Sequence, residues 1–211
     1  MSDFEDLCRV APGVSRETYD RLKVYQSEFE AWNARINLSS SGTMRDFWSR
    51  HVLDSAQIWA LALKQSGIAG SWVDLGSGGG LPGMVIAILN KDSGFPVTLI
   101  ESNRKKTGFL HSVNAKTGAG AFIRSGRIED EVIHVKQPDF ITARALAHLE
   151  TLLGLALPLF SDRTRAYFPK GRGYRQEIEE SRRNWTYDLV EHASATDVES
   201  TILEVRRPVR R

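Results

Sequence analysis

The stretch Ser71–Gly83 limits the possible folds of this chain more than any other. A short apolar run from Trp72 to Leu75 leads into five glycines within eight residues, and a second apolar segment begins at Met84. This order predicts a buried strand, a tight turn and the start of a helix. Glycines let the backbone approach a ligand closely, and the first turn of a helix leaves N–H groups unpaired. Because five glycines exceed what a turn alone requires, we expect a ligand-binding site here.

The glycines fit two kinds of nucleoside cofactor. The pattern Gly78-x-Gly80-x-x-Gly83 matches the dinucleotide fingerprint, in which a pyrophosphate lies on the helix N-terminus. The pattern Asp74-x-Gly76-x-Gly78 instead resembles motif I of S-adenosylmethionine (SAM) methyltransferases. An acid at the strand end would repel a pyrophosphate but suits the cationic end of SAM, and the proline of the turn removes an N–H group that a phosphate would use. The stretch favours SAM, with a nicotinamide cofactor as the alternative.

Around this turn, the chain changes from a helical beginning to alternating strands and helices. Residues 1–66 carry apolar side chains at helical spacing after an N-cap at Ser15, and a second helix is expected over Arg45–Trp59. Residues 67–211 predict an α/β domain with a mostly parallel, doubly wound, seven-stranded sheet whose ligands bind beyond the carboxyl ends of the strands. We therefore expect one globular unit, a SAM-binding domain with a helical N-terminal extension. The expected strands are Trp72–Leu75, Val97–Glu101, Ala121–Arg124, Phe140–Ala143, Thr164–Phe168, Tyr187–His192 and Thr201–Arg206, the last two as an antiparallel hairpin at one edge. The expected helices between them are Leu81–Asn90, Arg104–Thr117, His148–Leu157 and Tyr174–Asn184.

Composition and charge exclude several classes of protein. The single cysteine, Cys8, excludes an internal disulfide or a cysteine-based metal site, and the five histidines are too scattered for zinc ligands, so we expect no metal. The longest apolar run, Leu152–Phe160, is too short to span a bilayer, and no leader opens the chain, so we expect a cytoplasmic protein without a membrane partner. Residues 102–136 and 142–175 each carry a net charge of +4. Such blocks indicate either a positive face for a polyanion or ordinary solvated helix faces.

Polar residues at the ends of the expected strands are candidates for the site. Glu101 ends the second strand, where a carboxylate can accept both ribose hydroxyls of a nucleoside cofactor. Ile128 and Glu129 follow the third strand, in the region where adenine contacts an apolar side chain and polar partners. Arg144 follows the fourth strand, which faces the methyl acceptor in a methyltransferase, and Lys170 ends the fifth, where it could meet an RNA phosphate.

Three polar residues of the helical extension are further candidates. Asn37 lies one helical turn after Asn33, and His51 and Asp54 lie one turn apart on the second expected helix. They either cover the pocket or serve as helix-packing polar groups and caps.

Absent residues narrow the choice of methyl acceptor. Methylation of pyrimidine C5 needs a cysteine nucleophile, and Cys8 lies far from every expected strand end. Methylation of exocyclic amines usually comes with an Asn/Asp-Pro-Pro-aromatic motif after the fourth strand, where this chain has Thr-Ala-Arg-Ala. N7 of guanine carries a lone pair and loses no proton, so its methylation needs no general base and depends on positioning and electrostatics. The lack of a recognisable base is consistent with an N7 enzyme.

Six motifs occur in an order typical of one protein family. They are Trp32-Asn33-x-x-x-Asn37-Leu38-Ser39, His51-x-x-Asp54-Ser55, the glycine stretch Asp74–Gly83, Glu101-Ser102-x-x-Lys105-Lys106-x-x-Phe109-Leu110, Arg144-Ala145 and Lys170-Gly171. Together they cover residues 20–172 and resemble the RsmG family, the ribosomal RNA small-subunit methyltransferases G formerly called glucose-inhibited division protein B. One departure is Ala143, where many relatives carry a serine, so no hydroxyl role is expected there.

The resemblance implies a class I, Rossmann-like methyltransferase that moves a methyl group from SAM to N7 of guanine 527 in 16S rRNA and leaves S-adenosylhomocysteine (SAH). Its partner would be 16S rRNA, within the small ribosomal subunit or a precursor, and we expect a monomer. Carried over by motif, the cofactor residues are Gly76, Leu81, Ile128, Glu129 and Arg144, with Glu101 on the ribose and Asp74, Gly78 and Gly80 in the turn. Arg144 would position cofactor or guanine, with Lys170, Asn37, His51 and Asp54 as further active-site candidates. The alternatives are a SAM-dependent methyltransferase for another RNA or a small molecule, and a SAM- or RNA-binding module without catalysis.

Overall fold

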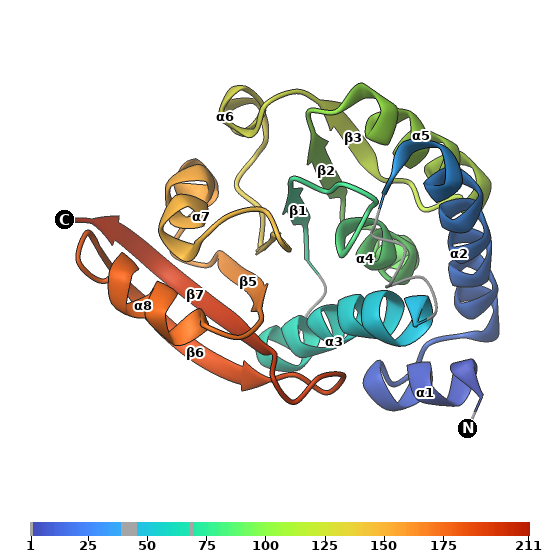
Figure 1. Ribbon diagram of the computed structural model, residues 1–211, viewed down its shortest axis with the longest axis horizontal. Coiled ribbons are helices and arrows are strands. Elements are labelled where there is room, and N and C mark those ends of the chain that lie inside the picture. The colour runs from blue at the N-terminus through green and yellow to red at the C-terminus, as the bar shows by residue number, and fades with distance from the viewer. Residues whose placement is uncertain (1, 39–45, 68–69) are drawn as a thin grey trace.

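The computed structural model describes residues 2–38, 46–67 and 70–211, which form a seven-stranded sheet of order β3-β2-β1-β4-β5-β7-β6 (Figure 1). Strands β1 to β5 pair in parallel, whereas β7 runs antiparallel to both β5 and β6. This confirms the expected mostly parallel sheet with a hairpin at one edge. The strands are β1 (Trp72–Leu75), β2 (Val97–Glu101), β3 (Phe122–Ser125), β4 (Phe140–Thr142), β5 (Arg165–Lys170), β6 (Trp185–Ala193) and β7 (Thr201–Arg210).

The hairpin is longer than the sequence predicts. The sequence predicts that the last strand ends at Arg206. Pairing with β6 instead continues to Arg210 past an irregularity between Thr186 and Asp188, where Arg207 has a positive φ of 50°. The arginine-rich end of the chain is therefore part of the sheet rather than a basic tail.

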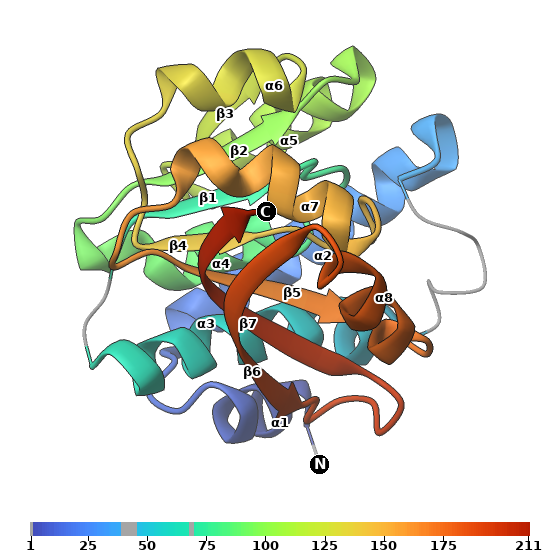
Figure 2. The same cartoon turned by 90° about the vertical axis from the view of Figure 1, so that its left-hand side faces the viewer.

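Helices cover both faces of the sheet because side chains alternate along each strand. Trp72 and Leu99 point into a hydrophobic cluster formed with α1 to α5, whereas Val73 and Ile141 point into a second cluster formed with α6 to α8. In Figure 2, α7 and α8 lie on the near side of the sheet. The helices are α1 (Asp3–Val10), α2 (Arg16–Ile36), α3 (Asp54–Ser66), α4 (Gly83–Asn90), α5 (Arg104–Thr117), α6 (Ile128–Glu131), α7 (Leu149–Ala156) and α8 (Tyr174–Ser181). Short 3-10 turns follow three of them, at η3 (Lys91–Ser93), η4 (Val132–His134) and η5 (Leu157–Leu159).

The helical extension packs directly on the sheet. The Oγ atom of Ser15 accepts the N–H of Thr18 at 3.1 Å, which confirms the expected N-cap of α2. The helix expected over Arg45–Trp59 differs: a π-helix, η2 (Trp48–Leu53), leads straight into α3, which continues to Ser66, while Arg45 lies outside the described residues. Residues of α1 and α2 share one hydrophobic cluster with β1, β2 and β5.

Candidate active site

Three glycines in the turn between β1 and α4 have backbone conformations that residues with a Cβ rarely adopt. Gly76, Gly78 and Gly80 have φ angles of 65°, 56° and 83°. A Cβ on Gly80 would lie 2.7 Å from Cβ of Met84, so Gly80 lets the turn pack on α4. A Cβ on Gly78 would instead meet open space, its nearest neighbour being the Gly76 carbonyl oxygen at 3.8 Å. Gly78 therefore borders a hollow that a side chain would fill.

Asp74 lies beneath this turn and borders none of the hollows described below. Its side chain is fully buried, and its two oxygens accept from Thr142 Oγ1 at 2.8 Å and from the Gly83 N–H at 3.2 Å. Burial raises the pKa of this carboxyl to about 6, although the hydrogen bonds act in the opposite direction. A Cβ on Gly83 would overlap the carboxylate, so glycine is required at the first position of α4. Asp74 thus fixes the start of α4, and its contact with the cationic end of a cofactor stays a prediction.

A first hollow of about 360 Å³ lies at the carboxyl ends of β1, β2 and β3. Glu101 stands in its wall, where Oε2 accepts the Gly78 N–H and Oε1 accepts the Asn103 N–H, both at 2.7 Å. These bonds hold the carboxylate in place and leave lone pairs for further donors. Ile128 forms a buried apolar wall with 9% of its surface exposed, and Glu129 is exposed at the rim.

A second hollow of about 470 Å³ adjoins the first on the side of the helical extension. Gly76, Gly78, Lys106 and Ala145 border both hollows, so the two are continuous. Leu81 lines the second hollow. An elongated ligand could lie across both.

Arg144, which follows β4, reaches from the sheet to the helical extension. Its Nη1 donates to Asp54 Oδ2 and to the Arg50 carbonyl oxygen, both at 3.3 Å, and its Nη2 lies 3.2 Å from His51 Nδ1. A guanidinium can only donate, so Nδ1 of His51 accepts and the ring proton is on Nε2. Burial first, and then the charge of Arg144, lower the pKa of His51 to about 4, so the ring is neutral at pH 7.

Asp54 joins three segments that are far apart in the sequence. Besides Arg144, it binds Thr196 and Gln57, whose Oγ1 and Nε2 atoms donate to Asp54 Oδ1 at 3.0 and 2.8 Å. Gln57 Oε1 in turn accepts the Ala195 N–H at 2.8 Å. The loop between β6 and β7 is thereby attached to the first turn of α3. The π-helix before α3 brings both His51 and Asp54 to Arg144, and π-turns often occur at functional sites.

A third hollow of about 460 Å³ lies on the other side of Arg144, toward β5 and α8. Lys170 borders it and donates to the Ala147 carbonyl oxygen at 2.8 Å and to Glu177 at 2.7 Å. Ala145 borders all three hollows and has a φ of 53°, a left-handed conformation that is uncommon for a residue with a Cβ and is often found at functional sites.

The structure brings most of the predicted site residues together around these hollows. Asp74 instead lies beneath the turn, and Gly80 lies in the turn against α4, so neither residue borders a hollow. Asn37 is the exposed C-cap of α2, with a left-handed φ of 59°, and borders none of the three hollows.

Three residues for which the sequence predicts no role also form the site. Lys106 borders two hollows, Leu38 borders the second, and Thr142 holds Asp74. Lys106 stands in the first turn of α5 after Arg104 and Lys105, where the helix dipole disfavours positive charge. That conflict is a signal that the sequence already contained. Leu38 and Lys106 also stand in motifs of the family resemblance, whereas Thr142 carries no comparable signal.

Within residues 2–38, 46–67 and 70–211, no group of three or more His, Cys, Asp or Glu side chains could hold a metal ion. In the same part of the chain, no helix combines the length and apolarity that crossing a membrane requires.

Comparisons with known proteins agree with this geometry. A family model described as rRNA small subunit methyltransferase G (GidB) matches residues 18–205. The ribosomal RNA small subunit methyltransferases G of Brucella canis and Brucella suis are each 46% identical over 203 residues, which cover 96% of this chain and 93% of theirs. Among solved structures, the O-methyltransferase from Bacillus cereus in complex with SAH has a TM-score of 0.57 at 15% identity and is covered over 95% of both chains. The ribosomal protein L11 methylase from Lactobacillus delbrueckii subsp. bulgaricus has a TM-score of 0.55 at 17% identity, over 72% of this chain and 78% of that one. The fold is thus that of the class I SAM methyltransferases.

Proposed function

This chain belongs to the family of ribosomal RNA small subunit methyltransferase G, and we propose that it transfers a methyl group from SAM to N7 of guanine 527 in 16S rRNA. The observation that carries the proposal is the row of three hollows at the carboxyl ends of the parallel strands, all of which meet at Ala145. The first two have the position expected for the cofactor of this fold, and the third lies where the methyl acceptor would enter.

The residues around the first two hollows fit SAM. The open Cβ position of Gly78 leaves room for a ligand against the backbone. Adenine would lie against Ile128 near Glu129, and Glu101 would accept the ribose hydroxyls without moving, because two backbone N–H groups already hold its carboxylate. The methionine half would extend past Leu81 into the second hollow, and SAH would leave by the same opening.

SAM supplies an electrophilic methyl carbon, whose bond to sulfur breaks as a bond to N7 forms, so that the sulfonium charge passes to the methylated guanine. Since N7 loses no proton, the protein needs only to align the guanine N7, the methyl carbon and the sulfur of SAM, and it needs no group that removes a proton. Arg144 stands between the second and third hollows, and Asp54 and His51 hold its guanidinium in one orientation. We assign Arg144 the positioning of cofactor and guanine, with Lys170 at the far side of the acceptor hollow.

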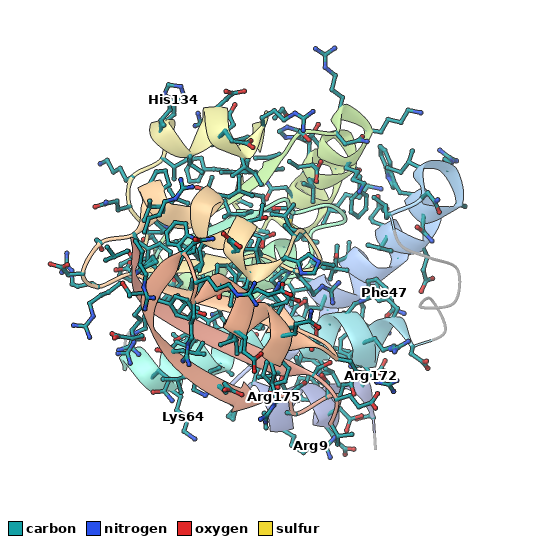
Figure 3. All side chains as sticks on the ribbon, turned by 60° about the vertical axis from the view of Figure 1, so that its left-hand side comes forward. Arg9, Phe47, Lys64, His134, Arg172 and Arg175 are labelled. Carbon is teal, nitrogen blue, oxygen red and sulfur yellow. The ribbon has the colours of Figure 1, made fainter. Side chains whose placement is uncertain are left out.

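The substrate would be rRNA in the small subunit or a precursor, bound by a monomer in the cytoplasm. Arg172 and Arg175, which are labelled in Figure 3, follow β5, and Arg104 and Arg127 follow β2 and β3, so exposed cations lie beyond the carboxyl ends of these three strands. They would bind backbone phosphates. In A-form RNA the groove that displays N7 is too deep and narrow for side chains, so the target guanine would be in a loop, a distorted helix or an exposed surface.

A transfer assay tests the proposal. The protein is incubated with radiolabelled SAM and with 16S rRNA, 23S rRNA, tRNA or whole small subunits, and N7-methylguanine is located by reduction and aniline cleavage. We expect one labelled guanine in 16S rRNA or the small subunit, and no label when 7-deazaguanosine replaces that guanine. Label in tRNA alone, or rRNA that is unchanged when the gene is deleted, would contradict the proposed acceptor.

A further inference from the structure

Lys106 is a half-buried cation in the wall of the site. It stands in the first turn of α5 and borders the first and second hollows where they join. Within the described parts of the chain, its ammonium group makes no hydrogen bond and no ion pair. The other cations at the hollows differ, because Arg144 is paired with Asp54, Lys170 is paired with Glu177, and Arg127 is exposed to solvent at the edge of the first hollow.

This arrangement is unfavourable for the protein without a ligand. A half-buried ammonium group has lost part of its hydration, and no carboxylate offsets that loss. The helix dipole adds a repulsion, because the first turn of α5 carries partial positive charge. An anionic group placed between the two hollows would remove both costs.

We propose that Lys106 binds the carboxylate of the methionine half of SAM, an inference that rests on the proposed use of SAM. The second hollow, where that half would lie, has neutral His51 and the already paired Arg144 in its wall, which leaves Lys106 to neutralise the carboxylate. Arg104 and Lys105 are exposed and border neither hollow, as expected of residues that face a polyanion outside the site. Lys106 instead lines the walls with Gly76 and Gly78, inside the space assigned to the cofactor.

Two ligands that differ only in the carboxylate test this assignment. Binding of SAH and of decarboxylated SAH is measured by calorimetry for the wild type and for Lys106→Met. We expect Lys106→Met to lower the affinity for SAH about tenfold, the typical contribution of a charge-assisted hydrogen bond. The affinity for decarboxylated SAH should change less than twofold. Lys106→Arg should recover part of the SAH affinity. Lys105→Met is the matched control, one position away and outside the hollows, and should bind both ligands as the wild type does.

Three results would overturn the assignment. Unchanged SAH affinity in Lys106→Met would do so, and a raised KM for rRNA alone would then identify Lys106 as a phosphate contact. An equal loss of affinity for both ligands would show a general distortion of the site. A wild-type protein that binds neither ligand would show that SAM is not the cofactor. The binding measurement contains no RNA and so does not depend on the methyl acceptor. The expected pattern of SAH affinities would support the role of Lys106 even if 16S rRNA receives no methyl group.

Discussion

Asp74 combines complete burial with a carboxylate that accepts two hydrogen bonds from the protein. One bond comes from Thr142 on the neighbouring strand β4, and the other comes from the first residue of α4, Gly83. The side chain thus ties two parallel strands to the helix that starts at the glycine turn. The cost is a buried acid whose pKa is raised to about 6 by its burial.

This raised pKa predicts a pH-dependent stability. The pKa in the folded state is about 6, above the ordinary aspartate value of 3.8, so the contribution of Asp74 to stability is complete below pH 3.8 and is lost as the pH rises through 6. Between pH 4 and pH 7, the free energy of unfolding of the wild type should fall relative to that of Asp74→Asn by roughly 2–3 kcal/mol. Urea unfolding of both proteins at several pH values measures the difference, in which other titrating groups cancel. Parallel curves would mean that Asp74 is ionised throughout.

Arg144 should matter more for activity than for stability. Its ion pair with Asp54 is mostly buried, with both side chains 18% exposed, but Asp54 keeps its hydrogen bonds to Gln57 and Thr196, so Arg144→Ala should lower the free energy of unfolding by roughly 1–3 kcal/mol. Methylation should fall about a hundredfold, because two or more charge-assisted contacts to the reacting groups are lost. Asp54→Asn keeps the arginine and should lose activity to a smaller extent. Single-turnover rates and melting temperatures of both variants separate the effect on activity from the effect on stability. If activity falls only in proportion to the folded fraction of the protein, the role of Arg144 is structural.

At the scale of elements, α2 lies directly on the glycine turn. The hydroxyl of Tyr25 donates to the Gly79 carbonyl oxygen at 2.7 Å, and Phe29 packs against the same glycine. Both aromatic side chains are fully buried and also contact Phe109 of α5. The helical extension therefore forms one wall of the second hollow, through Leu38 and His51.

Gly79→Ala should disturb this contact between elements. The new Cβ would lie 2.5 Å from Cε2 of Phe29, so the turn or α2 must shift. We expect a loss of roughly 1–3 kcal/mol of stability, as in other overpacked cores, together with weaker binding of SAH. Gly108→Ala is the control, because its Cβ on α5 would meet nothing within 4 Å and should stabilise the helix by about 0.5–1 kcal/mol. Denaturant unfolding and calorimetry measure both effects. A Gly79→Ala protein with wild-type stability and SAH affinity would show that α2 does not press on the turn.

The elements also show which features of the structure could be predicted from the sequence and which could not. The strands, the glycine turn and the N-cap at Ser15 could be predicted because their signals are local: short apolar runs, turn residues and a capping side chain. The contact of Arg144 with His51 and Asp54 could not, since it joins residues about ninety positions apart through a π-helix that no periodicity announces. The position of β7 inside the sheet depends likewise on pairing with β5. The sequence identified Asp74, but its partner Thr142 emerges only when two strands lie side by side.

At the scale of the whole molecule, the charge distribution rather than the net charge of +2 should govern RNA binding. Each phosphate contact made by an exposed cation releases counterions, so the logarithm of the binding constant should fall linearly with the logarithm of salt concentration. The double variant Arg172→Ala/Arg175→Ala should reduce this slope by about 1–2 and should weaken binding to RNA of any sequence to the same extent. Filter binding across a salt series measures this. If the affinity for rRNA does not depend on salt concentration, the exposed cations do not form the RNA-binding surface.

The junction at Asp54 has a consequence for genetics. One carboxylate there holds α3, the arginine after β4 and the loop before β7. Alleles that abolish methylation should therefore fall in three separate parts of the gene, including codons 194–196 of the loop between β6 and β7. Second-site suppressors of an allele in that loop should map to the first third of the gene, near the codon for Gln57, rather than beside the original lesion.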